Sequence, residues 1–314
     1  MEKEFFERLA QKGVSRRDFL RFCSLLTATL GLSSSFVPKV AEVFAAPKQR
    51  PPVIWLSFGE CTGCTESLLR TMYPWMADLV LDILSIEYHE TIMAASGHQA
   101  EENLKNAVKK YQGKFICVVD GSIATNYNGA YGKIADRTFL EIAREVCPQA
   151  LAVVSMGTCA SFGGIPAAKP NPGGYKGVKD ALGLKTVNIS GCPPNPVNLV
   201  GTIVNYLLLD RLPALDDLGR PLFAYSNTIH DQCPRRSYFE SNNFVLEFGS
   251  IEARMGYCLY KLGCKGPETY NNCPTVKFLG GTSWPIQAGH PCIGCSEPNF
   301  WDEMTPFYRE NIKA

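Results

Sequence analysis

The chain has 314 residues, which predicts about two domains, and 46% of them are hydrophobic, enough to bury a full core. Its formal net charge is only +1, so it lacks the concentrated positive charge typical of nucleic-acid-binding proteins. No apolar run reaches the roughly 18–20 residues that a membrane-crossing helix needs. The unusual feature is 13 cysteines, too few for a small disulfide scaffold and too many for incidental core thiols.

Residues 1–46 have the order of an export leader. Arg16 and Arg17 form a twin-arginine pair, an apolar stretch covers residues 22–32, and small residues at 43–46 offer a cleavage site. This order is typical of twin-arginine (Tat) signal peptides. We therefore expect export to the bacterial periplasm. The alternative is a soluble N-terminal helix in which two arginines happen to be adjacent.

Residues 47–211 alternate short, β-branched runs with helical patterns. The alternation predicts a parallel α/β sheet with helices on both faces. Strands are expected at 53–57, 79–86, 115–119, 150–154 and 186–189, and helices over 100–111, 134–146 and 197–209.

Four cysteines follow predicted strands. Cys61 and Cys64 come after the first strand, and Cys159 and Cys192 each follow a later one. Because parallel strands present their carboxyl ends at one edge of a sheet, these loops should meet there. The sequence therefore predicts a site with four thiolates at this edge.

Residues 212–314 lose this periodicity and are rich in Gly, Pro, Asn and Cys, apart from a helix expected over 250–262. A segment with so little regular structure can scarcely pack a core alone. We expect a smaller, mostly irregular second domain that inorganic cross-links hold together.

The cysteines allow several interpretations. An exported chain could form six disulfides, or structural zinc could occupy Cys₄ or Cys₃His sites. Core packing fits Cys117 and Cys147, which lie among apolar neighbours, and Cys23 leaves with the leader. Ten cysteines and one histidine remain, and several iron–sulfur clusters on one chain would indicate electron transfer.

Four motifs, in this order, resemble the small subunit of periplasmic nickel–iron uptake hydrogenases. They are GECTGC at 59–64, GTCA at 157–160, GCPPNP at 191–196 and AGHPCIGCSEP at 288–298. The resemblance implies a flavodoxin-like first domain and a hydrogenase, an H2:acceptor oxidoreductase, whose nickel–iron centre lies on a separate large subunit. No catalytic residue is expected on this chain, which would relay electrons from H2 oxidation.

The resemblance also implies three clusters and their ligands. A proximal [4Fe–4S] cluster would bind Cys61, Cys64, Cys159 and Cys192; a medial [3Fe–4S] cluster would bind Cys273, Cys292 and Cys295; and a distal [4Fe–4S] cluster would bind His230, Cys233, Cys258 and Cys264. On spacing alone, His230 could equally be a solvated or packed side chain.

Three other positions refine this expectation. Pro285 stands where relatives with a four-iron medial cluster have a fourth cysteine, so one corner of that site lacks a ligand. Gly63 and Gly164 stand where oxygen-tolerant relatives have additional cysteines. The resemblance thus implies an oxygen-sensitive enzyme.

The expected partners are the large subunit and an electron acceptor, either a cytochrome c or a membrane cytochrome b or quinone-linked subunit. No nucleic acid is expected, and membrane association would come through a partner because the C-terminal residues are polar. Two alternatives remain open. One is a zinc- or disulfide-stabilised exported binding protein without a redox role, and the other is the related quinone-reducing subunit of respiratory complex I.

Overall fold

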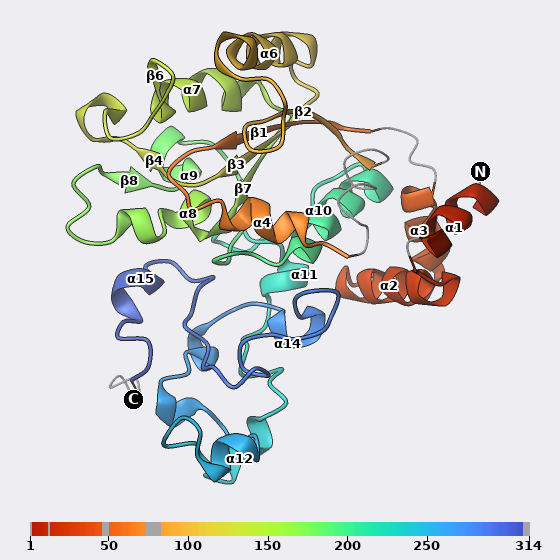
Figure 1. The fold of residues 1–314 in the computed structure, drawn as a ribbon, viewed down its shortest axis with the longest axis vertical. Coiled ribbons are helices and arrows are strands. Elements are labelled where there is room, and N and C mark those ends of the chain that lie inside the picture. The colour runs from red at the N-terminus through yellow and green to blue at the C-terminus, as the bar shows by residue number, and fades with distance from the viewer. Residues whose placement is uncertain (1, 12, 46–49, 73–82, 310–314) are drawn as a thin grey trace.

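The computed structural model describes residues 2–11, 13–45, 50–72 and 83–309. A five-stranded sheet forms its centre, with the C-terminal third below it and the N-terminal helices to one side in Figure 1. Among the described residues, no helix combines the length and apolar character needed to span a bilayer.

All pairings in the central sheet are parallel, in the order β2-β1-β3-β7-β9. This order is the one found in flavodoxin-like folds, where ligands bind beyond the carboxyl ends of the strands. The predicted fold class is therefore confirmed. The strands are β1 (Pro52–Ser57), β2 (Ser85–His89), β3 (Ile116–Asp120), β7 (Ala152–Met156) and β9 (Val187–Ile189).

The edge strand β2 begins later than the sequence predicts. The expected strand covered 79–86, of which residues 79–82 lie outside the described part of the chain, and β2 itself runs from Ser85 to His89. Its partner β1 shifts register between Val53 and Ile54, so the pairing there is irregular.

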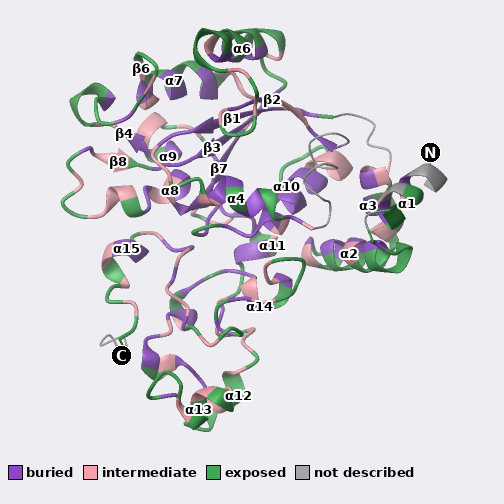
Figure 2. Cartoon of the chain, viewed as in Figure 1, coloured by how far each residue is buried: buried purple, intermediate pink, exposed green. Residues whose placement is uncertain are grey.

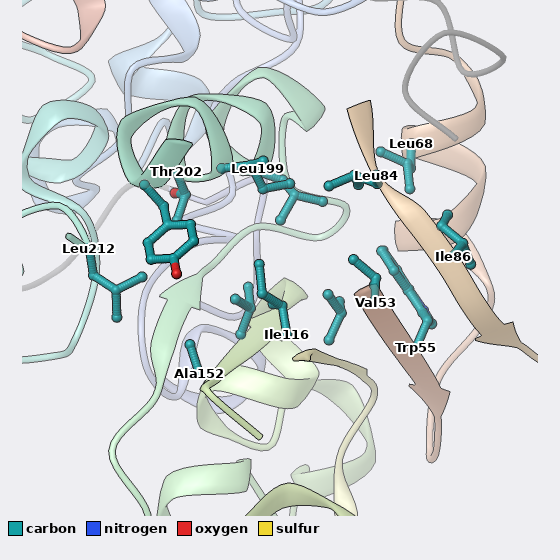
Figure 3. Close-up of a pocket in the computed structure, with 14 residues that line it drawn as sticks. Val53, Trp55, Leu68, Leu84, Ile86, Ile116, Ala152, Leu199, Thr202 and Leu212 are labelled. Atoms are coloured by element: carbon teal, nitrogen blue, oxygen red, sulfur yellow. The ribbon is translucent and has the colours of Figure 1, made fainter. Parts of the chain in front are cut away.

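Alternating side chains of the strands form two cores. Ile54 and Leu56 pack with apolar residues of α6 (Gly97–Lys110) and α7 (Phe139–Val146) on one face. Val53 and Trp55 pack with α10 (Pro196–Leu209) on the other face. Figure 2 shows that the strands are largely buried, and Figure 3 shows side chains of α10 opposite those of β1 and β3.

The helix predicted over 134–146 begins five residues later. Ile134 instead belongs to β5 (Lys133–Ile134), which pairs with β6 (Arg137–Thr138) in a short antiparallel hairpin. Thr138 then caps α7 in a reciprocal capping box with Glu141, and this cap fixes where the helix starts. The helices predicted over 100–111 and 197–209 are confirmed as α6 and α10.

Short elements lie in the connections between the strands. They are α4 (Gly63–Leu69), β4 (Ile123–Ala124), η3 (Asn126–Gly129), η4 (Cys147–Gln149), α8 (Gly157–Phe162), η5 (Ile165–Ala167), β8 (Tyr175–Lys176) and α9 (Val178–Leu182). Of these, α4 and α8 are the first helices after β1 and β7, so they carry Cys64 and Cys159 to the carboxyl end of the sheet.

The N-terminal segment, in which the sequence predicts an export leader, packs against the sheet domain. It forms α1 (Glu2–Gln11), α2 (Arg16–Thr29), η1 (Ser34–Phe36) and α3 (Val37–Ala45), and α2 and α3 contact α10. Phe19 and Leu26 of α2 are buried in the same core as Val200 of α10, whereas Arg16 and Arg17 are exposed. One face of the apolar stretch at 22–32 is therefore covered, while Leu25 and the arginine pair face solvent.

The C-terminal third folds around a small core. Ile229, Val245, Leu259, Trp284 and Ile286 belong to it, and several cysteines pack against them. Beyond β9 the described residues form no strand longer than an isolated bridge. The helices are α11 (Leu222–Tyr225), α12 (Arg236–Glu240), α13 (Ile251–Arg254), η6 (Tyr260–Leu262), η7 (Gly266–Glu268), α14 (Cys273–Val276) and α15 (Phe300–Glu303).

The helix predicted over 250–262 is wrong. Only Ile251–Arg254 is α-helical, with Ser250 as its N-cap, and Gly256 then takes a φ of 78° that ends the turn. Cys258 pairs with a different segment, because its backbone N–H donates to Asn243 and its carbonyl accepts from Val245. These tertiary hydrogen bonds outweigh the local helical pattern.

Candidate metal centres

Three loops bring four cysteines together at the carboxyl edge of the sheet. Cys61 follows β1, Cys64 lies in the first turn of α4, Cys159 lies on α8, and Cys192 follows β9. Their thiols are close enough to influence one another electrostatically. The convergence of the four residues that the sequence predicts is therefore present in the structure.

The electrostatics of this site disfavour thiolates without a compensating charge. Burial and then the neighbouring Cys192 raise the pKa of Cys159 to about 12. Burial, followed by the nearby Asp120 carboxylate, raises the pKa of Cys64 well above its ordinary value. Iron cations would supply the positive charge that lets such a group of cysteines ionise together.

Glycine backbones line the same site. A Cβ added at Gly157 would lie 2.4 Å from Cys64 Sγ, and one at Gly164 would lie 2.4 Å from Cys159 Sγ. Gly63 is less tight, with 3.2 Å to Cys61 Sγ. Such close approach of main chain to sulfur fits a cluster that is enclosed by its loops, because cluster sulfurs accept hydrogen bonds from backbone N–H groups.

One polar residue beside this site is absent from the sequence prediction. Asp120 ends β3, is fully buried, and has no hydrogen-bond partner for Oδ1 among the described residues. Thr65 Oγ1 donates to its other oxygen at 3.4 Å, and burial raises the pKa of Asp120 to about 7. In the sequence, Asp120 could have been recognised as an acidic residue at the end of a buried strand, at the edge of the sheet where ligands bind.

A second group consists of Cys273, Cys292 and Cys295, which lie in the C-terminal third. Cys273 begins α14, and the other two belong to one loop where the Gly294 N–H donates to Cys292 Sγ at 3.4 Å. Burial, then the neighbouring Cys264 and Cys295, raises the pKa of Cys292. The second group therefore combines three thiols with one backbone N–H that donates to a sulfur.

Pro285 differs from its neighbours in exposure. Trp284 and Ile286 are buried in the core that Cys273 and Cys292 contact, whereas Pro285 itself is exposed. Proline also offers no ligand atom, so it contributes no fourth donor to this group.

The third group lines one cavity at the far end of the C-terminal third. His230, Cys233, Cys258 and Cys264 all border it. Phe239 packs edge-on against the His230 ring, with 4.7 Å between ring centroids. Burial, then the positive charge of Arg236, lowers the pKa of His230, so its imidazole is neutral at neutral pH and able to bind a metal.

The remaining cysteines lie away from these groups. Cys117 and Cys147 are buried in the core beneath α6 and α7 with their sulfurs 3.8 Å apart, as predicted for packed thiols. Cys23 is buried in α2. All 13 cysteines are free, which does not support a disulfide framework.

The donor set fits clusters better than single ions. Within the described ranges, no three His, Cys, Asp or Glu side chains converge on one metal position. Ligands of a cluster are spread more widely than those of one ion, because the cluster's own iron and sulfide atoms occupy the space between them. The thiol-rich groups are the chemistry that iron–sulfur clusters require.

Two family models match successive parts of the chain. Residues 61–206 match the 20 Kd subunit of NADH ubiquinone oxidoreductase, and residues 225–308 match the C-terminal family of the NiFe/NiFeSe hydrogenase small subunit. The second match covers the two groups of ligands that follow the sheet domain, and it distinguishes this chain from the respiratory complex I alternative.

Whole-chain relatives agree with the second model. The periplasmic [NiFe] hydrogenase small subunit 1 of Nitratidesulfovibrio vulgaris is 53% identical, with 96% of this chain and 95% of the relative covered. The quinone-reactive Ni/Fe-hydrogenase small chain of Wolinella succinogenes is 47% identical over 95% and 85%. A solved Ni-Fe-Se hydrogenase of Desulfomicrobium baculatum superimposes with a TM-score of 0.77 at 36% identity, covering 83% of this chain and all of that one.

The fold and its cysteine groups therefore define an iron–sulfur, electron-transfer subunit of a hydrogenase. More particularly, the chain belongs to the family of periplasmic-type [NiFe] hydrogenase small subunits. Such a subunit pairs with a large subunit that holds the catalytic centre. A zinc- or disulfide-stabilised binding protein without a redox role is not supported.

Proposed function

We propose that the chain holds three clusters in series between the large subunit and an external electron acceptor. The proximal [4Fe–4S] cluster is assigned to Cys61, Cys64, Cys159 and Cys192; the medial [3Fe–4S] cluster to Cys273, Cys292 and Cys295; and the distal [4Fe–4S] cluster to His230, Cys233, Cys258 and Cys264.

The observation that carries this proposal is the contact between successive groups. Thr158, which precedes Cys159, donates its hydroxyl to the Cys295 carbonyl, which joins the first group to the second. Cys292 accepts a backbone hydrogen bond from Lys265, the residue after Cys264, at 2.8 Å, which joins the second to the third. A linear order of sites is what stepwise electron transfer requires.

The clusters supply one-electron redox chemistry when bound. The protein's contribution is to hold the thiolates, approach the sulfurs with backbone N–H groups, and exclude water by burial. A neutral His230 in place of a thiolate removes one negative charge from the distal site and raises its reduction potential. A higher potential suits the end at which electrons leave.

The edge around the proximal group is proposed to face the large subunit. Both Cys61 and Cys192 are exposed in the isolated chain, and Ile165, which follows Gly164, is 52% exposed. A partner subunit would cover these residues, exclude solvent from the proximal cluster and deliver electrons to it.

The electron acceptor is proposed to be a cytochrome c or a membrane cytochrome b or quinone-linked subunit. The quinone-reactive relative supports a quinone-linked route. Membrane association would then come through that partner. The leader is proposed to direct Tat export to the periplasm, and two relatives are named as periplasmic.

The glycines at 63 and 164 support an oxygen-sensitive enzyme, since no additional thiolate stands beside the proximal group at those positions. Hydrogen oxidation is expected to stop under air in the purified heterodimer. Sustained turnover under air would contradict this part of the proposal.

Metal analysis of the anaerobically purified heterodimer tests the cluster assignment. We expect about eleven irons attributable to this chain, with matching acid-labile sulfide. Cys61→Ser, Cys273→Ser and Cys258→Ser should each perturb a different cluster signal in EPR. Cys147→Ala, a buried thiol outside the three groups, is the matched control and should retain all the iron. Zinc in place of iron would overturn the proposal.

A further inference from the structure

Thr158 connects loops that belong to two different groups of cysteines. It is buried, with 1% exposure, and precedes Cys159 on α8. Its backbone N–H donates to the Gly191 carbonyl and its Oγ1 accepts from the Gly191 N–H, both at 2.9 Å. The same hydroxyl donates to the Cys295 carbonyl at 2.5 Å.

The Thr158 hydroxyl therefore uses both of its hydrogen-bonding roles at once. As an acceptor it holds Gly191, the residue before proximal Cys192, and as a donor it holds the backbone of medial Cys295. Of the side chains available at this position, only Ser and Thr combine these two roles at this size. A valine of the same shape would break both bonds.

The two loops held in this way carry ligands of different groups. Gly191 precedes Cys192, and the Thr158 O–H directs its positive end at the main chain of Cys295 itself. A hydrogen-bond donor beside a ligand stabilises negative charge there, which favours the reduced cluster and raises its potential.

A second set of contacts holds the medial loop from its other side. Arg220 is 4% exposed and binds the Glu297 carboxylate at 3.0 Å, and the same guanidinium nitrogen lies 3.5 Å from the Ser296 carbonyl. The residues after Cys295 are thus fixed independently, so Thr158 controls how the proximal loop lies against an already anchored medial loop.

We propose that Thr158 is a positioning residue for electron transfer between the proximal and medial clusters. Its hydroxyl holds Gly191, the neighbour of Cys192, to the backbone of Cys295, which sets both the separation of the two ligands and the potential of the medial site. This inference rests on the proposed assignment of the two clusters.

The test compares Thr158→Val with Thr158→Ser in the complete heterodimer. The medial potential is measured by redox titration of the EPR signal of the oxidised three-iron cluster. Hydrogen–deuterium exchange of the peptide containing Gly191 and Cys192 reports on the loop itself. Thr186→Val is the matched control, because Thr186 is also buried and donates one hydroxyl bond, to Asn188 Oδ1, at the opposite end of β9.

We expect Thr158→Val to lower the medial potential, leave the distal potential unchanged, and speed exchange of the peptide that contains Gly191. Thr158→Ser and Thr186→Val should match the wild type in all three. Thr158→Ala, which also lacks the hydroxyl but adds no apolar volume, replaces the valine variant if the latter fails to assemble.

An unchanged medial potential in the variants without the hydroxyl would overturn the inference. So would a shift that Thr158→Ser shares, because it would be caused by side-chain volume. Failure of the cluster assignment is recognised separately, by a wild-type heterodimer that lacks the expected iron and the three-iron EPR signal.

Discussion

The backbone of Gly157 lies against the sulfur of Cys64. A Cβ built on Gly157 would stand 2.4 Å from Cys64 Sγ, a distance that ordinary side chains do not adopt, and its φ is 88°. The residue thus meets two requirements at once, a left-handed backbone conformation and the absence of a side chain. Both follow from bringing α8 and α4 to one site.

Gly157→Ala should therefore remove the proximal cluster. The added methyl group would push Cys64 out of position, because the neighbouring backbone leaves no room for it. We expect the loss of about four irons per heterodimer and of H2-dependent reduction of the acceptor, while the medial and distal EPR signals remain. Iron analysis with EPR measures this.

Gly183→Ala provides the control for backbone strain. Gly183 has a similar φ of 71°, but nothing lies within 4 Å of an added Cβ. The Gly183→Ala substitution should lower the free energy of unfolding by about 1–2 kcal/mol and leave the iron content unchanged. Equal iron content in both variants would show that the position of Cys64 Sγ does not require a residue without a side chain at 157.

The proximal site was predictable because parallel strands share an edge. Once Cys61, Cys159 and Cys192 are each found directly after a buried strand, the topology alone brings them together. The medial and distal groups lie outside the parallel sheet, so no strand order brings their cysteines together. Their assignment came from the resemblance, since an irregular chain does not reveal which distant cysteines meet.

Other features depend on tertiary contacts that no local pattern encodes. In the sequence, nothing distinguishes Thr158 from other polar residues. Only the structure reveals its hydrogen bonds to Gly191 and Cys295. The leader likewise has the pattern of an independent segment, although Phe19 and Leu26 share a core with α10. In each case the contacts of the residue are made with a segment that is distant in sequence.

Pro285→Cys is expected to convert the medial site to a four-iron cluster. A thiolate at this position would provide the missing fourth ligand, and the cluster potential should fall as the three-iron cluster is replaced. The change should appear as loss of the oxidised three-iron EPR signal and a gain of about one iron per chain.

Pro285→Ser is the appropriate comparison for this change. It releases the same backbone restriction but offers no thiolate, so the three-iron signal should persist. A persistent three-iron signal in the cysteine variant as well would mean that position 285, exposed between buried Trp284 and Ile286, cannot reach the cluster.

Replacing both Arg16 and Arg17 by lysine should prevent export without affecting the fold. Both side chains are exposed at the start of α2; Arg16 also lies over the Phe6 ring, 4.8 Å from its centroid, where lysine keeps a positive charge. If the leader is a Tat signal, the heterodimer should accumulate in the cytoplasm with its iron intact. Cell fractionation with antibody detection measures this. Arg21→Lys, an exposed arginine on the same helix, should be exported normally, and equal export of all variants would refute a twin-arginine signal.

His89 should make the subunit sensitive to mild acid. It is 1% exposed and stacks on Trp55, with ring centroids 4.9 Å apart. Burial lowers the pKa of His89 from 6.5 to about 4. Between those values the unfolded chain gains a proton that the folded chain does not, so stability falls as the pH falls.

From pH 7 to pH 5 this linkage amounts to about 2 kcal/mol. His89→Gln should lower stability at pH 7, because the imidazole also accepts a hydrogen bond from the Thr91 N–H. On acidification to pH 5, however, the variant should lose less stability than the wild type. Calorimetric unfolding of the heterodimer at both pH values measures the difference. His98→Gln, at an exposed position on α6, should keep the wild-type dependence on pH. An equal dependence in the His89 variant would mean that burial in the folded core does not lower the pKa of this imidazole.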